Sequence, residues 1–377
     1  MKGTPTLEED RFCQVARSFI DAHWSGQPAG ASAVVKRDRW FSALASAGYA
    51  VPHWPVSEGG TGWSLRERYL WRRELAAALA PFPDPVATQW AGPALLQAGT
   101  AAQRARWLPG IRQLQTRWCL WLEDWEQTTT SGFEARGRAQ RVPGANASDL
   151  LLTLLPEQEQ PGTQSAEYAA TLCVVDLRAP GVVRARSARS AVVELPPLQT
   201  AVADGIVERL GMPGSGLREL GTLVQAVLME PTSALHVAAV ADALDRAAPE
   251  LPGDEGTLDT DPAWQRRRAE LDVTLTGLEV LAERLAAGHA PRAIAAALRE
   301  RLTHTRDMLE ALLVDSFGYY ASVDADPELL HNEGPIGHHG LLSALRSALR
   351  ADDGTAIESA LRVLAVIPAS ADSESAP

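Results

Sequence analysis

Three short features of this sequence could do chemistry. The first is the stretch His331–Gly340, HNEGPIGHHG, whose histidines and glutamate could serve as a metal or acid–base cluster. Because His338 and His339 are adjacent, their side chains diverge in a helix or a strand, and neither an HExxH pattern nor a matching cysteine supports zinc. We interpret the stretch as a loop rich in glycine and proline, with Glu333 as an outside candidate for pocket chemistry.

The second feature is Val51–Ser64, VPHWPVSEGGTGWS, in which a Gly-Gly-Thr-Gly turn could cradle a phosphate. A phosphate loop of this kind needs a preceding strand, whereas the residues before this turn have helical spacing. Glycines permit positive φ and close approach of the backbone, while the prolines and Trp54 stiffen the chain. We therefore expect a structural corner and not a binding site.

The third feature is the set of cysteines, Cys13, Cys119 and Cys173. They are few, odd in number and far apart, so they form neither a CxxC metal pair nor a disulfide framework. We expect three buried thiols.

The composition limits the partners that the chain can have. With 377 residues, of which 46% are apolar and 22% charged, it can bury a large core in two or three lobes. Its formal charge of −12 disfavours a nucleic-acid or anionic-membrane partner. The sequence holds no run of roughly 18 apolar residues that could span a membrane, and MKGTPTLEEDRF has no apolar signal core, so we expect a cytoplasmic protein.

The periodicity along the chain predicts an α+β multidomain protein. Helical spacing predicts an N-terminal helical domain over residues 1–115. Short β-branched runs separated by turn residues predict a middle β domain, sandwich-like or barrel-like, over residues 116–212. Long amphipathic runs predict a C-terminal helix bundle over residues 213–370, followed by a tail at 371–377.

Two passages in the first lobe then point to a family. They are RWFSALASAGYAVPHWPVSEGGTGWSLRE at residues 39–67 and GPALLQAGTAAQRARWLPGI at Gly92–Ile111. In this order and at this spacing they resemble the acyl-CoA dehydrogenases, flavoproteins that introduce a double bond between Cα and Cβ of acyl-CoA thioesters. The bundle sequence resembles the branch that acts on steroid side-chain CoA esters, in which two different subunits commonly form one heterotetramer.

The residues that face the flavin depart from the family pattern. The family has a Leu-Thr-Glu-Pro run at the start of the β domain, and here Glu123 keeps the acidic position while Leu122 and Asp124 replace the threonine and the proline. Pro143 and Gly144 stand where the family has an aromatic residue and a hydroxyl residue. In place of the arginine passage that contacts the FAD diphosphate stands PELPGDEGTLDTDP at residues 249–262, which we expect to be exposed, and its acids would repel a diphosphate.

The resemblance also implies a catalytic carboxylate that removes the α-proton. The two family locations for this base correspond here to Asp353, in Asp353-Gly354-Thr355, and to Glu230, which precedes Pro231. Aspartate is one methylene shorter than the family's glutamate, and a misplacement of about 1 Å can cost roughly a hundredfold in rate. Pro231 indicates a helix start, where Glu230 would act as a capping acid.

The resemblance therefore implies a flavin-poor subunit of a heteromeric, FAD-dependent acyl-CoA dehydrogenase that acts on a steroid or bile-acid side-chain CoA thioester. It implies a second family subunit, α2β2 assembly, FAD held mainly by that partner, and residual cofactor contacts at Glu123, Gly354 and Thr355. One alternative is a self-sufficient homomeric dehydrogenase with Asp353 or Glu230 as base. Another is a non-enzymatic scaffold that binds acyl-CoA or a protein.

Overall fold

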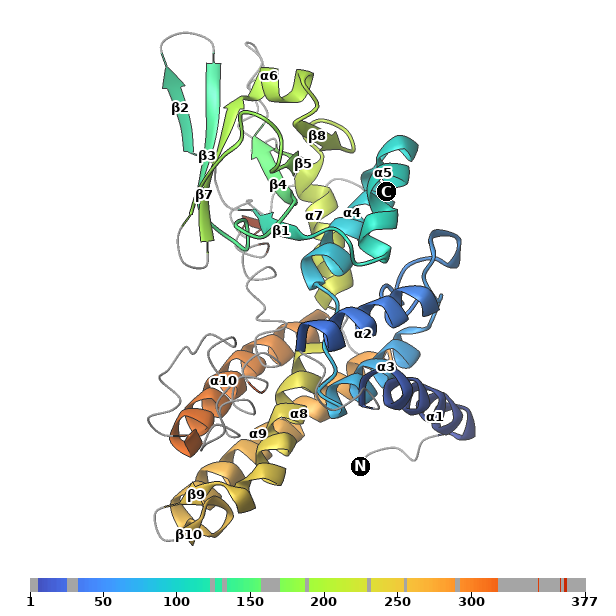
Figure 1. Ribbon diagram of the computed structural model, residues 1–377, viewed down its shortest axis with the longest axis vertical. Coiled ribbons are helices and arrows are strands. Elements are labelled where there is room, and N and C mark those ends of the chain that lie inside the picture. Colours follow the sequence, from blue (N-terminus) through green and yellow to red (C-terminus); the bar gives the residue numbers. More distant parts are fainter. Residues whose placement is uncertain are drawn as a thin grey trace, which may run out of the picture. The chain divides into compact units, whose positions relative to one another are not determined.

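The computed structural model describes residues 6–25, 33–122, 126–130, 134–156, 170–186, 190–228, 232–253, 256–288 and 292–317, together with positions 345, 360, 363 and 364 (Figure 1). Contacts gather in two compact units, each drawn from separate parts of the sequence. The helical unit comprises Met1–Trp40, Trp63–Phe82 and Leu228–Asp353. The sheet unit comprises Phe41–Gly62, Pro83–Val227 and Gly354–Pro377.

Capping boxes begin two helices near the N-terminus of the chain. Thr6 pairs with Glu9 at the start of α1 (Leu7–Ile20), and Ser64 pairs with Glu67 at the start of α3 (Leu65–Ala77). Between these helices lie η1 (Asp21–Ser25) and α2 (Ala33–Ala47). Trp40 is fully buried and donates its indole N–H to the carbonyl of Pro81 at 2.7 Å. The one polar group of this large side chain therefore has a hydrogen-bond partner within the helical unit.

The rest of the helical unit consists of long helices and a short β-ribbon. In chain order these elements are α8 (Thr232–Ala247), η4 (Ala248–Glu250), β9 (Pro252–Gly253), β10 (Gly256–Thr257), η5 (Leu258–Thr260), α9 (Pro262–Ala286) and α10 (Arg292–Phe317). One apolar cluster joins α8, α9 and α10, and a second joins α1 and α3 to these three helices. The amphipathic runs of the sequence are therefore packed helices, as predicted.

Most described residues of the acidic segment at 249–262 are exposed, as expected, but two leucines within it are buried. Leu251 and Leu258 are 1% and 4% exposed and belong to the core of the helical unit. Asp261 caps α9, because its carboxylate accepts the backbone N–H of Ala263 at 2.7 Å and that of Trp264 at 3.3 Å. Turn residues separate the two leucines, so the sequence showed no apolar periodicity that would predict their burial.

The sheet unit carries short helices and two sheets. Its helical elements are η2 (Val56–Glu58), η3 (Val86–Ala91), α4 (Gly92–Ala98), α5 (Ala101–Arg112), α6 (Leu198–Ala203) and α7 (Gly216–Leu228). Its strands are β1 (Trp118–Trp121), β2 (Glu126–Thr130), β3 (Glu134–Pro143), β4 (Leu150–Pro156), β5 (Ala170–Asp176), β6 (Val183–Arg186), β7 (Ser190–Pro197) and β8 (Val207–Leu210).

In the described part of the chain, these strands form two four-stranded sheets, ordered β1-β4-β5-β8 and β2-β3-β7-β6. β1 runs parallel to β4, and the other neighbouring strands are antiparallel. Alternate residues of both sheets, such as Cys119, Leu151 and Val193, enter one buried cluster. The predicted order of helices, strands and helices is confirmed, while the domain boundaries at 115/116 and 212/213 stay a prediction.

The Gly-rich corner is built around Trp54, which is 1% exposed and donates its indole N–H to the carbonyl of Thr88 at 3.2 Å. Gly59 and Gly62 have positive φ, at 87° and 69°. A Cβ on Gly60 would lie 2.1 Å from the carbonyl oxygen of Trp54. The glycines therefore serve close backbone packing, as expected of a structural corner.

Candidate functional site

All five residues that the resemblance proposes for the site, namely Glu123, Glu230, Asp353, Gly354 and Thr355, lie outside the described residues. The same holds for the stretch His331–Gly340, including Glu333, and for Asp124. The structure does describe the elements beside them: β1 ends at Trp121, and α8 begins at Thr232. Their catalytic and cofactor roles stay predictions.

The only residue that the structure describes between β1 and β2 is an apolar leucine. Leu122, which takes the position of the family's threonine, is 3% exposed. Two residues before Trp121, the thiol of Cys119 lies 3.6 Å from the carbonyl oxygen of Leu150, and burial raises its pKa to about 12. The thiol therefore stays protonated at neutral pH, and neither it nor Leu122 supplies an anion or a hydroxyl at this end of the strand.

The connection from β3 to β4 is a tight turn. Pro143 and Gly144 are exposed, and Gly144 has a φ of 72°. Ser148 donates its hydroxyl to the carbonyl of Gly144 at 2.9 Å. Arg184 donates to the carbonyls of Ala145 and Ser148, both at 3.2 Å, so the polar groups of this segment hold the turn itself.

Asp84 is a half-buried acid whose structural role the sequence did not reveal. Burial raises the pKa of Asp84, while hydrogen bonds from the backbone N–H groups of Val86, Trp118 and Ala87 lower it, and burial prevails. The N–H of Val86 lies 2.9 Å from the carboxylate. Because these donors belong to η3 and to β1, Asp84 ties the two elements together. Its partner in β1 lies 34 positions away in the sequence.

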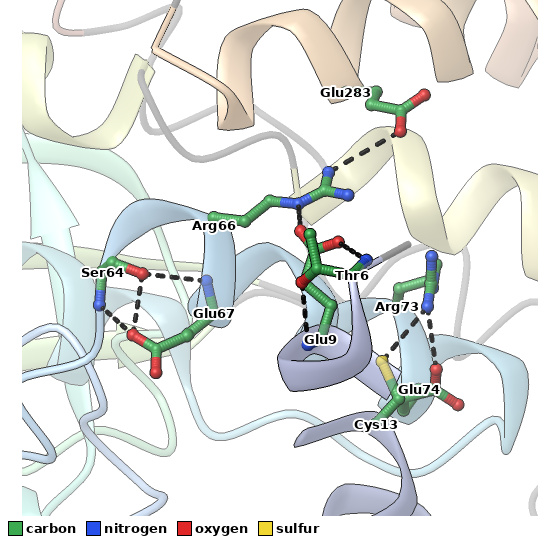
Figure 2. Close-up of polar contacts among 9 residues, drawn as sticks. All are labelled: Thr6, Glu9, Cys13, Ser64, Arg66, Glu67, Arg73, Glu74 and Glu283. Atoms are coloured by element: carbon green, nitrogen blue, oxygen red, sulfur yellow. Dashed lines mark hydrogen bonds and ion pairs between the residues drawn. The ribbon is translucent and has the colours of Figure 1, made fainter. Parts of the chain in front are cut away.

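The helical unit contains a network of charged side chains between α1 and α3. Arg17 binds Glu74 through two hydrogen bonds of 2.7 and 3.0 Å. Arg73 contacts both Glu74 and Cys13 (Figure 2). Its guanidinium donates to the carboxylate at 3.1 Å and to the thiol sulfur at 3.3 Å. Burial alone would raise the pKa of Glu74, but hydrogen bonds from the two arginines outweigh it and lower that pKa.

A second part of this network reaches α9. Arg66 donates to Glu9 at 2.6 Å, and its guanidinium lies 3.7 Å from the carboxylate of Glu283 (Figure 2). The hydrogen bond from Arg66 lowers the pKa of Glu9, whose carboxylate also accepts the N–H of Thr6. Each of these acids is occupied by an arginine, so we interpret the network as a clamp between helices and not as a source of a general base.

In the part of the chain that the structure describes, no three or more His, Cys, Asp or Glu side chains are placed to hold a metal ion. The three cysteines are buried and unbridged, as predicted. No described helix is both long and apolar enough to cross a membrane.

Comparison with known proteins gives matches over part of the sequence. Residues 6–114 match the family model for the acyl-CoA dehydrogenase N-terminal domain. Acyl-CoA dehydrogenase FadE34 of Mycobacterium tuberculosis is 42% identical over 77 residues, which make up 20% of this chain and 11% of FadE34. Acyl-CoA dehydrogenase IpdE1 of Mycolicibacterium smegmatis is 38% identical over 87 residues, 22% of each chain. The matches thus cover less than a quarter of either relative.

Solved structures match over almost the whole chain at low identity. The ChsE4-ChsE5 complex from Mycobacterium tuberculosis has a TM-score of 0.65 at 16% identity, covering 97% of this chain and 98% of the matched chain. The Tcur3481-Tcur3483 steroid ACAD has a TM-score of 0.64 at 18% identity, with 97% and 98% covered. Butyryl-CoA dehydrogenase from Megasphaera elsdenii has a TM-score of 0.61 at 13% identity, with 97% and 99% covered.

Proposed function

We propose that this chain is the flavin-poor subunit of a heteromeric acyl-CoA dehydrogenase. The proposal starts from the acyl-CoA dehydrogenase fold of the chain and from the match of residues 6–114 to the N-terminal domain of that family. The complex would introduce a Cα=Cβ double bond into a bulky CoA thioester with a steroid or bile-acid side chain. The second subunit would be another member of the family, in an α2β2 assembly that works in the cytoplasm.

The observation that carries the proposal is Leu122, a side chain that is 3% exposed at the position where the family has a hydroxyl for the flavin. An aliphatic side chain can donate no hydrogen bond, and a buried one presents no polar group at the end of β1. Pro143 and Gly144, at the other flavin-facing position, form an exposed turn without an aromatic ring. The described residues at these positions therefore do not fit a flavin ring.

The segment at residues 249–262 supports the same conclusion. Leu251 and Leu258 pack into the core, and Asp261 caps α9, so these three residues have structural roles and do not supply donors for a diphosphate. The acids of this segment would repel a diphosphate. We therefore assign FAD mainly to the partner subunit and derive no redox step for this chain.

The relatives support the class of complex. Two structural neighbours are built from two named proteins each, ChsE4 with ChsE5 and Tcur3481 with Tcur3483, and the second pair is a steroid ACAD. FadE34 and IpdE1, which match this chain over 77 and 87 residues, are acyl-CoA dehydrogenases. A chain that keeps both sheets and the long helices can support such a partner and help to shape its acyl pocket.

The experiment that tests the proposal removes the two candidate bases. Asp353→Asn and Glu230→Gln nearly preserve shape, and in a supporting subunit each should leave the turnover of the co-purified complex within a few-fold of the parent. Loss of a true general base would reduce turnover by roughly a hundred- to ten-thousandfold. The assay uses a steroid side-chain CoA ester and an artificial electron acceptor.

Asp259→Asn serves as the matched control, because it changes an acid whose carboxylate accepts a hydrogen bond from the hydroxyl of Thr257 in the same turn. A large loss of turnover in Asp353→Asn or Glu230→Gln, with Asp259→Asn unaffected, would contradict the supporting role. That result would assign the catalytic base to this chain. A complex that forms but turns over no acyl-CoA would favour the scaffold.

A further inference from the structure

A buried carboxylate lies under an exposed loop at the edge of the sheet β1-β4-β5-β8. The loop Gly211–Ser215 joins β8 to α7, and Met212 within it is 71% exposed. Beneath the loop, in the first turn of α7, Glu219 is only 6% exposed. An acid this deeply buried needs a partner for its charge.

The loop is fixed tightly against this carboxylate. Gly211 has a φ of 74°, and a Cβ on it would lie 2.2 Å from Oε1 of Glu219, so a glycine is required here. Gly211 donates its N–H to the carbonyl of Ala98 at 3.0 Å, and Gly214 donates to the hydroxyl of Thr171 at 2.7 Å. The close approach is thus part of an ordered turn.

One carboxylate oxygen at this site lacks a hydrogen-bond donor among the described residues. The hydroxyl oxygen of Ser215 lies 2.6 Å from the carbonyl oxygen of Met212 and 2.8 Å from Oε1 of Glu219. A serine hydroxyl has one proton, so it can serve only one of these two acceptors. The other oxygen of Glu219, Oε2, is buried and has no hydrogen-bond partner among the described residues. The carbonyl oxygen of Met212 also accepts the backbone N–H of Ser215 at 3.1 Å, so Oε2 of Glu219 is the oxygen of this site that lacks a donor.

We propose that Glu219, Ser215 and Met212 form a binding site for a monovalent cation, Na⁺ or K⁺. A carboxylate, a hydroxyl and a carbonyl are hard oxygen ligands, which suit such ions. The site offers one carboxylate and neutral oxygens, whereas Ca²⁺ takes six to eight oxygens, several of them from carboxylates, and zinc takes histidine or cysteine ligands. The cation supplies the positive partner that Oε2 lacks. This site does not depend on the proposed function.

The test measures amide hydrogen exchange of the full-length chain by mass spectrometry, in peptides that cover residues 205–220. The exchange is compared in NaCl, KCl and choline chloride at equal ionic strength. Binding of Na⁺ or K⁺ should slow exchange of the loop by at least about tenfold at saturation, with a dependence on cation concentration that saturates. Peptides of β2 and β3 should not respond.

Two variants and a control decide the outcome. In Glu219→Gln, the side-chain amide can donate to Ser215 itself, so the loop should stay protected and lose its response to the cation. Ser215→Ala should weaken the response without abolishing the fold. Glu208→Gln changes an acid in the same unit that pairs with Arg106, and it should keep the response of the parent. Equal exchange in all three salts would overturn the proposal.

Discussion

Substitution of Gly60 by alanine should destabilise the fold strongly, because the corner at Val51–Ser64 is a packing device. The new Cβ would lie 2.1 Å from the carbonyl oxygen and 2.8 Å from the Cβ of Trp54. The first atom belongs to the backbone, and Trp54 is 1% exposed, so the clash cannot be relieved by turning a side chain into solvent. Overpacking of this kind costs about 1–3 kcal/mol, from which the lower entropy of the unfolded alanine chain subtracts about 0.4–1 kcal/mol. We expect a net loss of roughly 1–2 kcal/mol.

The assay is urea unfolding of the full-length chain, followed by tryptophan fluorescence and far-ultraviolet circular dichroism. Gly221→Ala is the matched control, because nothing lies within 4 Å of a Cβ at this position inside α7. It should be neutral or stabilising by up to about 1 kcal/mol. A loss below about 0.5 kcal/mol for Gly60→Ala, with a normal response of the control, would refute the interpretation of the corner as tight packing.

Three further predictions concern the thiols, the pH dependence and the assembly. Cys119 should resist iodoacetamide at neutral pH until the protein unfolds, because burial raises its pKa to about 12; rapid labelling of the native chain would contradict this. The pKa of Glu74 is lowered from 4.5, so its ion pairs stabilise the fold above pH 4.5 and are lost as the pH falls through the folded-state pKa. Glu74→Gln should therefore lower the free energy of unfolding in urea by about 1–3 kcal/mol at neutral pH. The difference between the two unfolding free energies should shrink below pH 4.5, and a difference that does not change with pH would exclude ionic pairing as the cause. Val273 and Val280 are 77% and 43% exposed on one face of α9. The chain alone should therefore self-associate, and the chain with its partner should form a defined complex. A monomer in light scattering at about micromolar concentration would contradict this.

Much of the fold follows from local patterns that the sequence displays openly. Ser64 and Glu67 have the spacing of a capping box, and the helix begins between them. The run DLLLTLL becomes β4, which lies inside a sheet with β1 on one side and β5 on the other, and its apolar residues are buried on both faces. Such elements depend on neighbours in the sequence, which is why periodicity and turn residues predict them.

Contacts between distant residues could not be predicted in the same way. Asp84, between two prolines, has the pattern of a turn, yet it accepts a hydrogen bond from the backbone of Trp118. Leu251 and Leu258 belong to the core although acids and turn residues surround them. In each case the environment is made by a partner that local spacing does not identify.

The candidate site has features that the sequence predicted and features that only the structure shows. The resemblance predicted that Leu122 replaces a hydroxyl residue, and the structure adds that its side chain is buried, which no substitution pattern could show. The positions Glu123, Glu230 and Asp353 rest on the resemblance, and the turnover of their variants is the test that applies to them.

The absorption spectrum of the chain purified alone tests the central claim most directly. The resemblance predicts that Leu122, Pro143 and Gly144 replace the flavin-facing residues. The isolated polypeptide should then be colourless, and flavin should appear only when the chain is purified together with its partner. A stoichiometric flavin spectrum from the isolated chain would contradict the supporting-subunit account.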